Sequence, residues 1–119
     1  MKYMMLIYAN GTDWQNFTPE QRKAAMQSWM EFRTATVTAG VLVSNETLFP
    51  ISDATSVRVR DGKTLIADGP FAETHEQLGG YFVLDCQDLD EALSWAAKMP
   101  GAQYGTVEVR PVVEINFDR

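Results

Sequence analysis

Local sequence signals specify both the start and the end of one helix. Thr18 is a preferred N-cap residue, Pro19 suits the first helical position, and Gln21 completes a capping box with Thr18. Gly40 stands where helices commonly end with a left-handed residue. Between these signals, small and apolar residues recur every three or four positions: Ala25, Trp29, Phe32, Thr36 and Ala39. We therefore predict a helix over residues 18–40 that lies on a sheet.

Strands are predicted on both sides of this helix. Residues 2–8 form an unbroken apolar and aromatic run, typical of a central strand, and a polar loop is expected from Asn10-Gly11 to residue 17. Residues 41–49 give a second strand. Residues 57–60 and 64–67 alternate around Asp61-Gly62, which indicates a hairpin with a type I′ turn and one solvated face.

The C-terminal part repeats the strand–helix–strand order. A strand is predicted at residues 81–86, and Asp88 with Glu91 resembles a capping box that starts a second helix. Pro100-Gly101 ends this helix. Its predicted buried face consists of Leu89, Leu93, Ala96 and Ala97.

The last predicted strand spans residues 106–115. Pro111 lacks an N–H donor, which implies an edge, a bulge or a break at that position. One face of the strand is predicted to carry Val107, Val109, Val113 and Ile115, and the other Glu108, Arg110 and Glu114.

The resulting order is β-α-β, a hairpin, then β-α-β, which predicts an α+β ferredoxin-like sheet with an extended hairpin and its helices on one face. At 119 residues the chain fits one domain, residues 1–119. The other face of such a sheet must be solvated or covered. Because the strands are apolar on both faces, we predict a homodimer in which two sheets pack face to face.

Composition excludes several classes of function. The net charge is −6, from 10 basic and 16 acidic residues, which disfavours nonspecific binding to nucleic acid or to anionic membranes. No apolar stretch approaches the ~20 residues of a membrane span, and residues 1–9 lack a signal-peptide pattern, so a cytoplasmic protein is expected. The single cysteine, Cys86, excludes an intrachain disulfide and lies in an apolar run, which favours a core role over a nucleophile.

Several separated blocks carry a family resemblance. Residues 68–74 have the sequence Asp-Gly-Pro-Phe-Ala-Glu-Thr, and residues 76–80 follow with Glu-Gln-Leu-Gly-Gly. The agreement continues through residues 88–92, 104–105 and 107–112, and it includes the first strand and the capped helix. The chain closely resembles the DGPF branch of the YCII-related proteins over nearly its whole length.

This resemblance implies a dimeric α+β barrel of two ferredoxin-like subunits, with a cleft between the sheet and the Asp-Gly-Pro-Phe loop. It also implies a bacterial protein associated with extracytoplasmic-function sigma factor systems. An enzymatic His–Asp pair has been suggested for YCII relatives. The only histidine here, His75, lies in residues 68–80, and the first helix contains none, so that mechanism is not carried over.

Two interpretations apply to residues 68–76. Asp68 with Gly69 and Pro70 is a turn sequence, but a partly desolvated Asp68 could act as acid or base, with Glu73 and Glu76 beside it around a ligand cleft. His75 could be a general base, although an exposed loop histidine is the commoner case. One histidine with scattered carboxylates does not predict a metal site, and no cofactor motif is present.

Arg110 and Tyr81 complete the candidate residues. The planar guanidinium of Arg110 could hold an anionic ligand, or it could pair with Glu108 or a partner's carboxylate. Tyr81 could line a pocket. The sequence leaves open whether the chain is an enzyme. We favour a small-ligand-binding or accessory protein linked to sigma-factor regulation, and the alternative is a cofactor-independent enzyme that uses Asp68 as acid or base on a small molecule.

Overall fold

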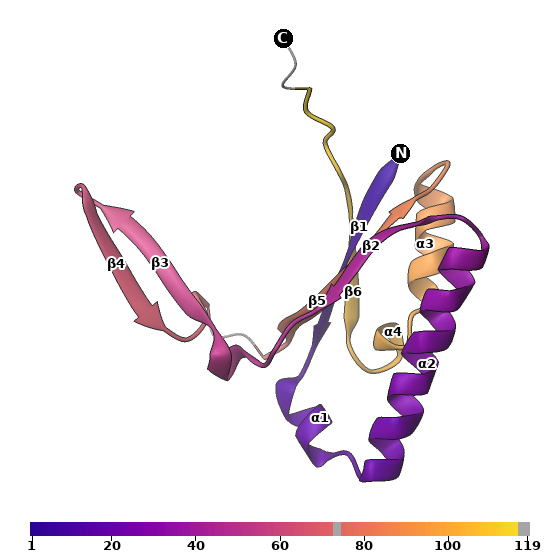
Figure 1. Cartoon of the computed structure of the whole chain (residues 1–119), viewed down its shortest axis with the longest axis horizontal. Helices are drawn as coiled ribbons and strands as arrows, with labels where there is room; N and C mark the ends of the chain where they lie inside the picture. The colour runs from indigo at the N-terminus through magenta and orange to yellow at the C-terminus, as the bar shows by residue number, and fades with distance from the viewer. Residues whose placement is uncertain (73–74, 117–119) are drawn as a thin grey trace.

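The structure is a computed structural model that describes residues 1–72 and 75–116. It has an α+β fold with a four-stranded sheet, a separate two-stranded hairpin and helices (Figure 1). The elements in chain order are β1 (Lys2–Ala9), α1 (Gly11–Asn16), α2 (Pro19–Thr38), β2 (Leu42–Thr47), the 3-10 helix η1 (Ile51–Asp53), β3 (Thr55–Arg60), β4 (Lys63–Asp68), β5 (Gln77–Asp85), α3 (Leu89–Ala97), α4 (Gly101–Tyr104) and β6 (Thr106–Pro111).

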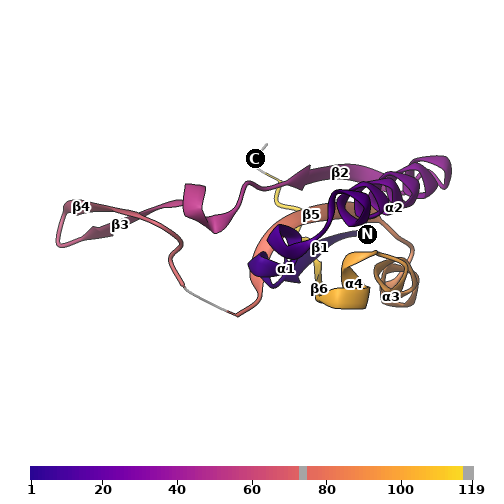
Figure 2. The ribbon, with the colours of Figure 1, turned by 90° about the horizontal axis from the view of Figure 1, so that it is seen from below.

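The sheet has the strand order β2-β5-β1-β6, and all its neighbouring strands are antiparallel. The helices α2 and α3 lie on the same side of it, as two views at right angles show (Figures 1 and 2). The predicted β-α-β, hairpin, β-α-β order is therefore confirmed. We call the face of the sheet opposite α2 and α3 the open face.

Local signals account for α2 as predicted. The Thr18 side chain accepts a hydrogen bond from the Gln21 N–H at 3.1 Å, and the Gln21 side chain accepts one from the Thr18 N–H at 2.8 Å. Gly40 has φ +73°, the left-handed conformation that ends a helix. Phe32 and Thr36 are buried on the predicted stripe, and Trp29 stacks on Phe82 of β5 with ring centroids 6.0 Å apart.

The core lies between the sheet and these two helices. The aromatic ring of Phe32 makes edge contacts with Phe82 and with Trp95 of α3. The buried apolar cluster consists of Tyr3, Met5, Phe32, Phe82, Leu84, Cys86, Ala92 and Met99. The prediction that Cys86 is a core residue is confirmed, because it is 2 % exposed.

The predicted buried face of α3 is wrong in part. The helix starts as predicted, since the Asp88 carboxylate accepts a hydrogen bond from the Glu91 N–H at 2.8 Å. Its buried residues, however, are Ala92 and Ala96, and the larger apolar residues Leu89 and Leu93 are 48 % and 46 % exposed. Two alanines four residues apart let the helix approach the sheet closely. Ala97 is exposed as well.

Two further boundaries differ from the expectation. A short helix, α1, occupies the predicted polar loop, and no apolar periodicity in its six residues marks it in advance. The last strand ends at Pro111, as a residue without an N–H donor allows on the edge strand β6. Of the four residues predicted to share one face of this strand, only Val107 and Val109 lie in it, and Val113 and Ile115 are 78 % and 65 % exposed beyond its end.

The hairpin β3–β4 projects away from the sheet, and we call it the arm (Figures 1 and 2). Its turn residues Asp61 and Gly62 have φ +52° and +72°, as a type I′ turn requires. The radius of gyration is 16.6 Å, whereas a compact chain of this length is expected near 13.5 Å, estimated as about 2.2·N^0.38. The alternation predicts one solvated face, and in the single chain nearly all residues on both faces of the hairpin are exposed.

Candidate functional site

The open face brings two of the predicted site residues, Tyr81 and Arg110, to one surface. In the sheet register Tyr81 lies opposite Leu6, and Leu6 lies opposite Glu108. Residues directly opposite each other in antiparallel strands share a face. Because Glu108 and Arg110 are two residues apart on β6, Tyr81 and Arg110 also share a face, with Cα atoms about 12 Å apart by ordinary strand spacing.

The centre of the open face is apolar. Met4 lies opposite both Val83 and Arg110, so a second row runs parallel to the first. Val83 is 8 % exposed, and Met4, Leu6 and Tyr81 are half-buried, although α2 and α3 lie on the other side of the sheet. The two rows therefore form a patch of aliphatic and aromatic side chains.

Charged groups border this patch on both sides. Glu46 of β2 lies opposite Tyr81, and Glu108 and Arg110 lie on β6 at the other side. All three side chains are exposed. Glu108 and Arg110 form no ion pair with any residue of the described ranges. The guanidinium of Arg110 is thus available to an external anion or to another chain.

Asp68 is the last residue of β4, paired with Thr55, and the chain bends at Gly69 without a hydrogen bond from the Asp68 carboxylate. Gly69 has φ +100°, its N–H donates to the Ala54 carbonyl at 2.7 Å, and its own carbonyl accepts a hydrogen bond from the Ser56 hydroxyl at 2.7 Å. Asp68 is exposed, and its side chain has no hydrogen bond or ion pair to a described residue. The backbone conformation of Gly69 and the Ser56 hydroxyl hold the turn.

The other candidates of this segment are not joined to Asp68. His75 is exposed and Glu76 is half-buried, just before β5 begins, while Glu73 lies outside the described residues. Residues 69–76 connect the arm to β5, and hence to the end of the open face where β5 begins. Across residues 1–72 and 75–116, no three His, Cys, Asp or Glu side chains are placed to hold a metal ion.

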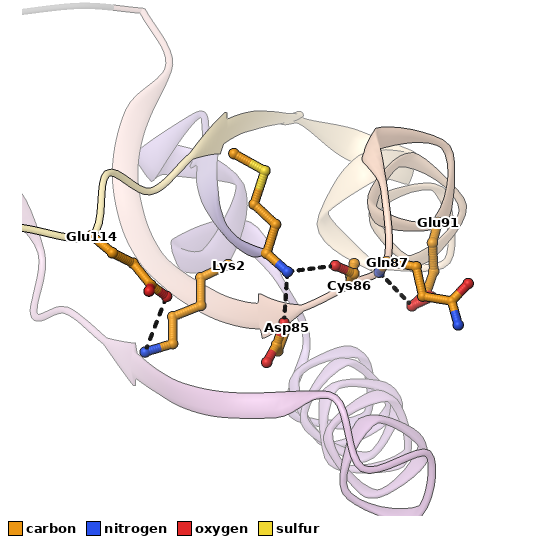
Figure 3. A network of polar contacts seen from close by, with 7 residues as sticks. Lys2, Asp85, Cys86, Gln87, Glu91 and Glu114 are labelled. Atoms are coloured by element: carbon orange, nitrogen blue, oxygen red, sulfur yellow. Dashed lines mark hydrogen bonds and ion pairs between the residues drawn. The ribbon is translucent and has the colours of Figure 1, made fainter.

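A second polar cluster surrounds Cys86 at the other end of β5 (Figure 3). The N-terminal ammonium of Met1 binds the Asp85 carboxylate at 3.0 Å and donates to the Cys86 carbonyl at 2.9 Å. The Gln87 N–H donates to the Glu91 carboxylate at 3.4 Å. Burial raises the pKa of the Cys86 thiol, and the Glu91 and Asp85 carboxylates raise it further. A neutral, buried thiol is a poor nucleophile, so this cluster has a structural role.

Sequence reasoning found Tyr81 and Arg110 but missed the neighbours that give them a common surface. Met4 and Leu6 lie within an apolar run whose two faces cannot be distinguished by periodicity, and Glu46 interrupts a predicted strand. The alternation of Glu108 and Arg110 with valines on β6 is the one signal that identifies this face from sequence.

None of the described helices is long and apolar enough to cross a membrane.

The sequence is similar to known proteins over nearly its whole length. The sequence matches the YCII-related domain over residues 1–116. It is also 36 % identical over 114 residues to an uncharacterized protein of Rhizobium meliloti (strain 1021), and the match covers 94 % of this chain and 92 % of that protein.

Proposed function

This chain belongs to the YCII-related domain family, and from that premise we propose that it is a homodimeric, small-ligand-binding accessory protein of the DGPF branch. The observation that carries the proposal is the open face, where an apolar centre is bordered by charged groups without ion pairs to described residues. The sequence of residues 68–80 supports the assignment to the DGPF branch.

Burial of apolar surface supports the proposed dimer. Met4, Leu6 and Tyr81 are the half-buried side chains of the open face, and covering them with a second copy of the same patch removes their remaining exposed surface from water. A twofold interface uses the same surface on both chains, which fits a patch that is apolar in the middle and charged at its sides. Two sheets packed in this way form a dimeric α+β barrel.

The ligand site lies where the two open faces meet the charged borders. Tyr81 offers an aromatic ring and a hydroxyl, and Arg110 offers a planar cation that can bind a carboxylate or phosphate through two hydrogen bonds. Such a pair suits a small molecule with an apolar or planar body and one anionic group. The acidic side chains of Glu46 and Glu108 disfavour ligands with several negative charges.

A thermal-shift screen of anionic metabolites tests the ligand proposal. A ligand present at 100 times its Kd should stabilise the native chain by about 2.7 kcal/mol. The shift should disappear in Arg110→Met and Tyr81→Ala, and it should persist in Lys23→Met, which removes an exposed cation from α2. Equal thermal shifts in Arg110→Met and in the native chain would show that the ligand does not bind at the open face.

An accessory role in transcription is proposed through protein or ligand contacts. The resemblance to partners of extracytoplasmic-function sigma factor systems supports this role, and the net charge of −6 disfavours direct contact with DNA. A mobility shift of DNA that survives about 200 mM salt would contradict this part of the proposal.

The second candidate is a cofactor-independent enzyme that uses Asp68 as acid or base. The observation that favours it is that the turn at Gly69 forms without the Asp68 carboxylate, which leaves that group for another purpose. Alanine at position 68 should then abolish turnover of the substrate and leave the fold intact. Turnover that survives in Asp68→Ala would exclude this mechanism.

A further inference from the structure

The arm is a two-stranded hairpin that lacks the cover which such hairpins need. An isolated two-stranded hairpin is marginally stable in water, and it usually requires a third strand or a packed face. The arm projects from the sheet in both views (Figures 1 and 2), and its residues are nearly all exposed. A further surface that covers the arm would therefore add to its stability.

One face of the arm is suited to such a surface. In the register of the hairpin Val57 lies opposite Ile66, and Val59 lies opposite Thr64 on the same face. Val57, Val59 and Ile66 are 62 %, 58 % and 69 % exposed. These β-branched side chains next to one another form an apolar face on a strand pair with open edges, which proteins normally bury or protect.

The arm and the open face of the sheet form the two sides of a V. Figure 1 shows the arm on the side of the sheet opposite α2 and α3, and Figure 2 shows the same arrangement at right angles. The chain measures 51 × 48 × 18 Å, as expected for such a flat, open shape. A second copy that covers the open face therefore lies beside the arm.

We infer that the arm clasps the second copy of the chain, with Val57, Val59 and Ile66 packed on the partner's surface. This inference rests on the homodimer proposed above and adds a second contact to it. Each strand of the arm has six residues and spans about 20 Å at 3.3 Å per residue, enough to reach past the edge of a neighbouring sheet.

Charge supports a second copy as the occupant. The arm, residues 55–68, carries the cations Arg58, Arg60 and Lys63 and the carboxylates Asp61 and Asp68, a net charge of +1, while the rest of the chain has 7 basic and 14 acidic residues. The rest of each protomer is therefore strongly acidic. Arg58, Arg60 and Lys63 lie on the face of the arm opposite Val57 and Ile66, outside the proposed apolar contact. The net positive arm is attracted to the acidic body of another copy through the overall electrostatic field.

The clasp also links the arm to residues 68–71. The guanidinium of Arg58 lies over the Phe71 ring, 4.5 Å from its centroid, so the start of the connection to β5 is attached to the side of the arm opposite Val57 and Ile66. When the arm is held by the partner, the segment that contains Asp68 is fixed beside the dimer interface. The sequence block that identifies the DGPF branch is then a structural part of the dimer.

Sedimentation equilibrium of matched variants tests the clasp. Val57→Ser with Ile66→Ser removes apolar groups from the arm, and Met26→Ser with Met30→Ser removes equally exposed ones (58 % and 68 %) from α2. We expect the arm variant to raise the dimer Kd at least about tenfold, from the lost apolar burial, and the α2 variant to leave it unchanged. A native dimer whose Kd is equally insensitive to both changes would overturn the clasp but not the homodimer, whereas a monomeric native chain would overturn both.

A cross-link gives a second test that does not depend on weakening the protein. p-Benzoylphenylalanine at position 57, in a mixture of ¹⁴N- and ¹⁵N-labelled full-length chains, should give cross-linked peptide pairs that combine both isotopes. Pairs that contain one isotope only, or no cross-linked pairs, would show that the arm does not contact a second copy and would overturn the inference.

Discussion

The Ser56 hydroxyl donates a hydrogen bond of 2.7 Å to the Gly69 carbonyl, which joins the start of β3 to the residue after β4. The Gly69 N–H donates to the Ala54 carbonyl, also at 2.7 Å. Together these two hydrogen bonds join β3 and β4 at the end of the arm that is attached to the rest of the chain.

Replacing Ser56 by alanine should loosen the arm without unfolding the body. One lost hydrogen bond costs about 1 kcal/mol, so amides of β3 and β4 should exchange with solvent about five times faster. Hydrogen exchange measured by mass spectrometry checks this. Ser52→Ala in η1 is the matched control, because Ser52 is exposed and has no side-chain hydrogen bond to a described residue. Equal exchange rates in Ser56→Ala and Ser52→Ala would show that the Ser56 hydrogen bond does not stabilise the arm.

Asp68→Ala and Gly69→Ala should behave differently. The Asp68 carboxylate forms no hydrogen bond or ion pair with a described residue, so its removal should change the exchange rates of the arm by less than about twofold. Gly69 has φ +100°, which alanine adopts only with strain of about 1 kcal/mol or more. The same experiment measures both. An effect of Asp68→Ala as large as that of Gly69→Ala would show that the Asp68 carboxylate helps to hold the backbone conformation at Gly69.

The two leucines at positions 84 and 89 should differ in their contribution to stability. Leu84 is fully buried between the sheet and the helices, and Leu89 on α3 is 48 % exposed. Leu84→Ala should lower the free energy of unfolding by about 2–5 kcal/mol, and Leu89→Ala by less than about 1 kcal/mol. Urea denaturation measures both values. Comparable losses would show that α3 packs through the leucine face predicted from its sequence.

Burial of Cys86 should make the stability depend on alkaline pH. Because the pKa of the thiol is raised in the folded chain, the unfolded chain releases the thiol proton first, and stability is lost as the pH rises through about 9. Below that pH both states keep the proton, and this contribution is fully present. Denaturation curves of the native chain and of Cys86→Ala from pH 7 to about 10 should therefore converge at the alkaline end. A constant difference between them would contradict the raised pKa.

The sequence predicts correctly those parts of the fold that depend on interactions between residues close together in the chain. The α2 helix starts and ends as predicted because Thr18, Gln21 and Gly40 act within one turn of it. The I′ turn at Asp61-Gly62 is likewise local. The buried face of α3 was mispredicted because close approach of Ala92 and Ala96 depends on the sheet beneath them, which the sequence of the helix does not describe.

The sequence predicts single residues of the candidate site but not their arrangement on one surface. Arg110 stands out because it alternates with valines on a strand, but its relation to Tyr81 depends on the register of β1 with both β5 and β6. The exposure of Val57 and Ile66 also could not be predicted, because alternation indicates one covered face without saying whether the same chain covers it.

The mass of the protein in solution at micromolar concentration distinguishes the proposed homodimer from a single chain. Light scattering should give twice the chain mass of 13.4 kDa for the native protein. Leu6→Glu, in the centre of the open face, should return it to the mass of one chain, and Leu89→Glu, on the exposed side of α3, should leave the dimer intact. A native protein with the mass of a single chain would contradict the account.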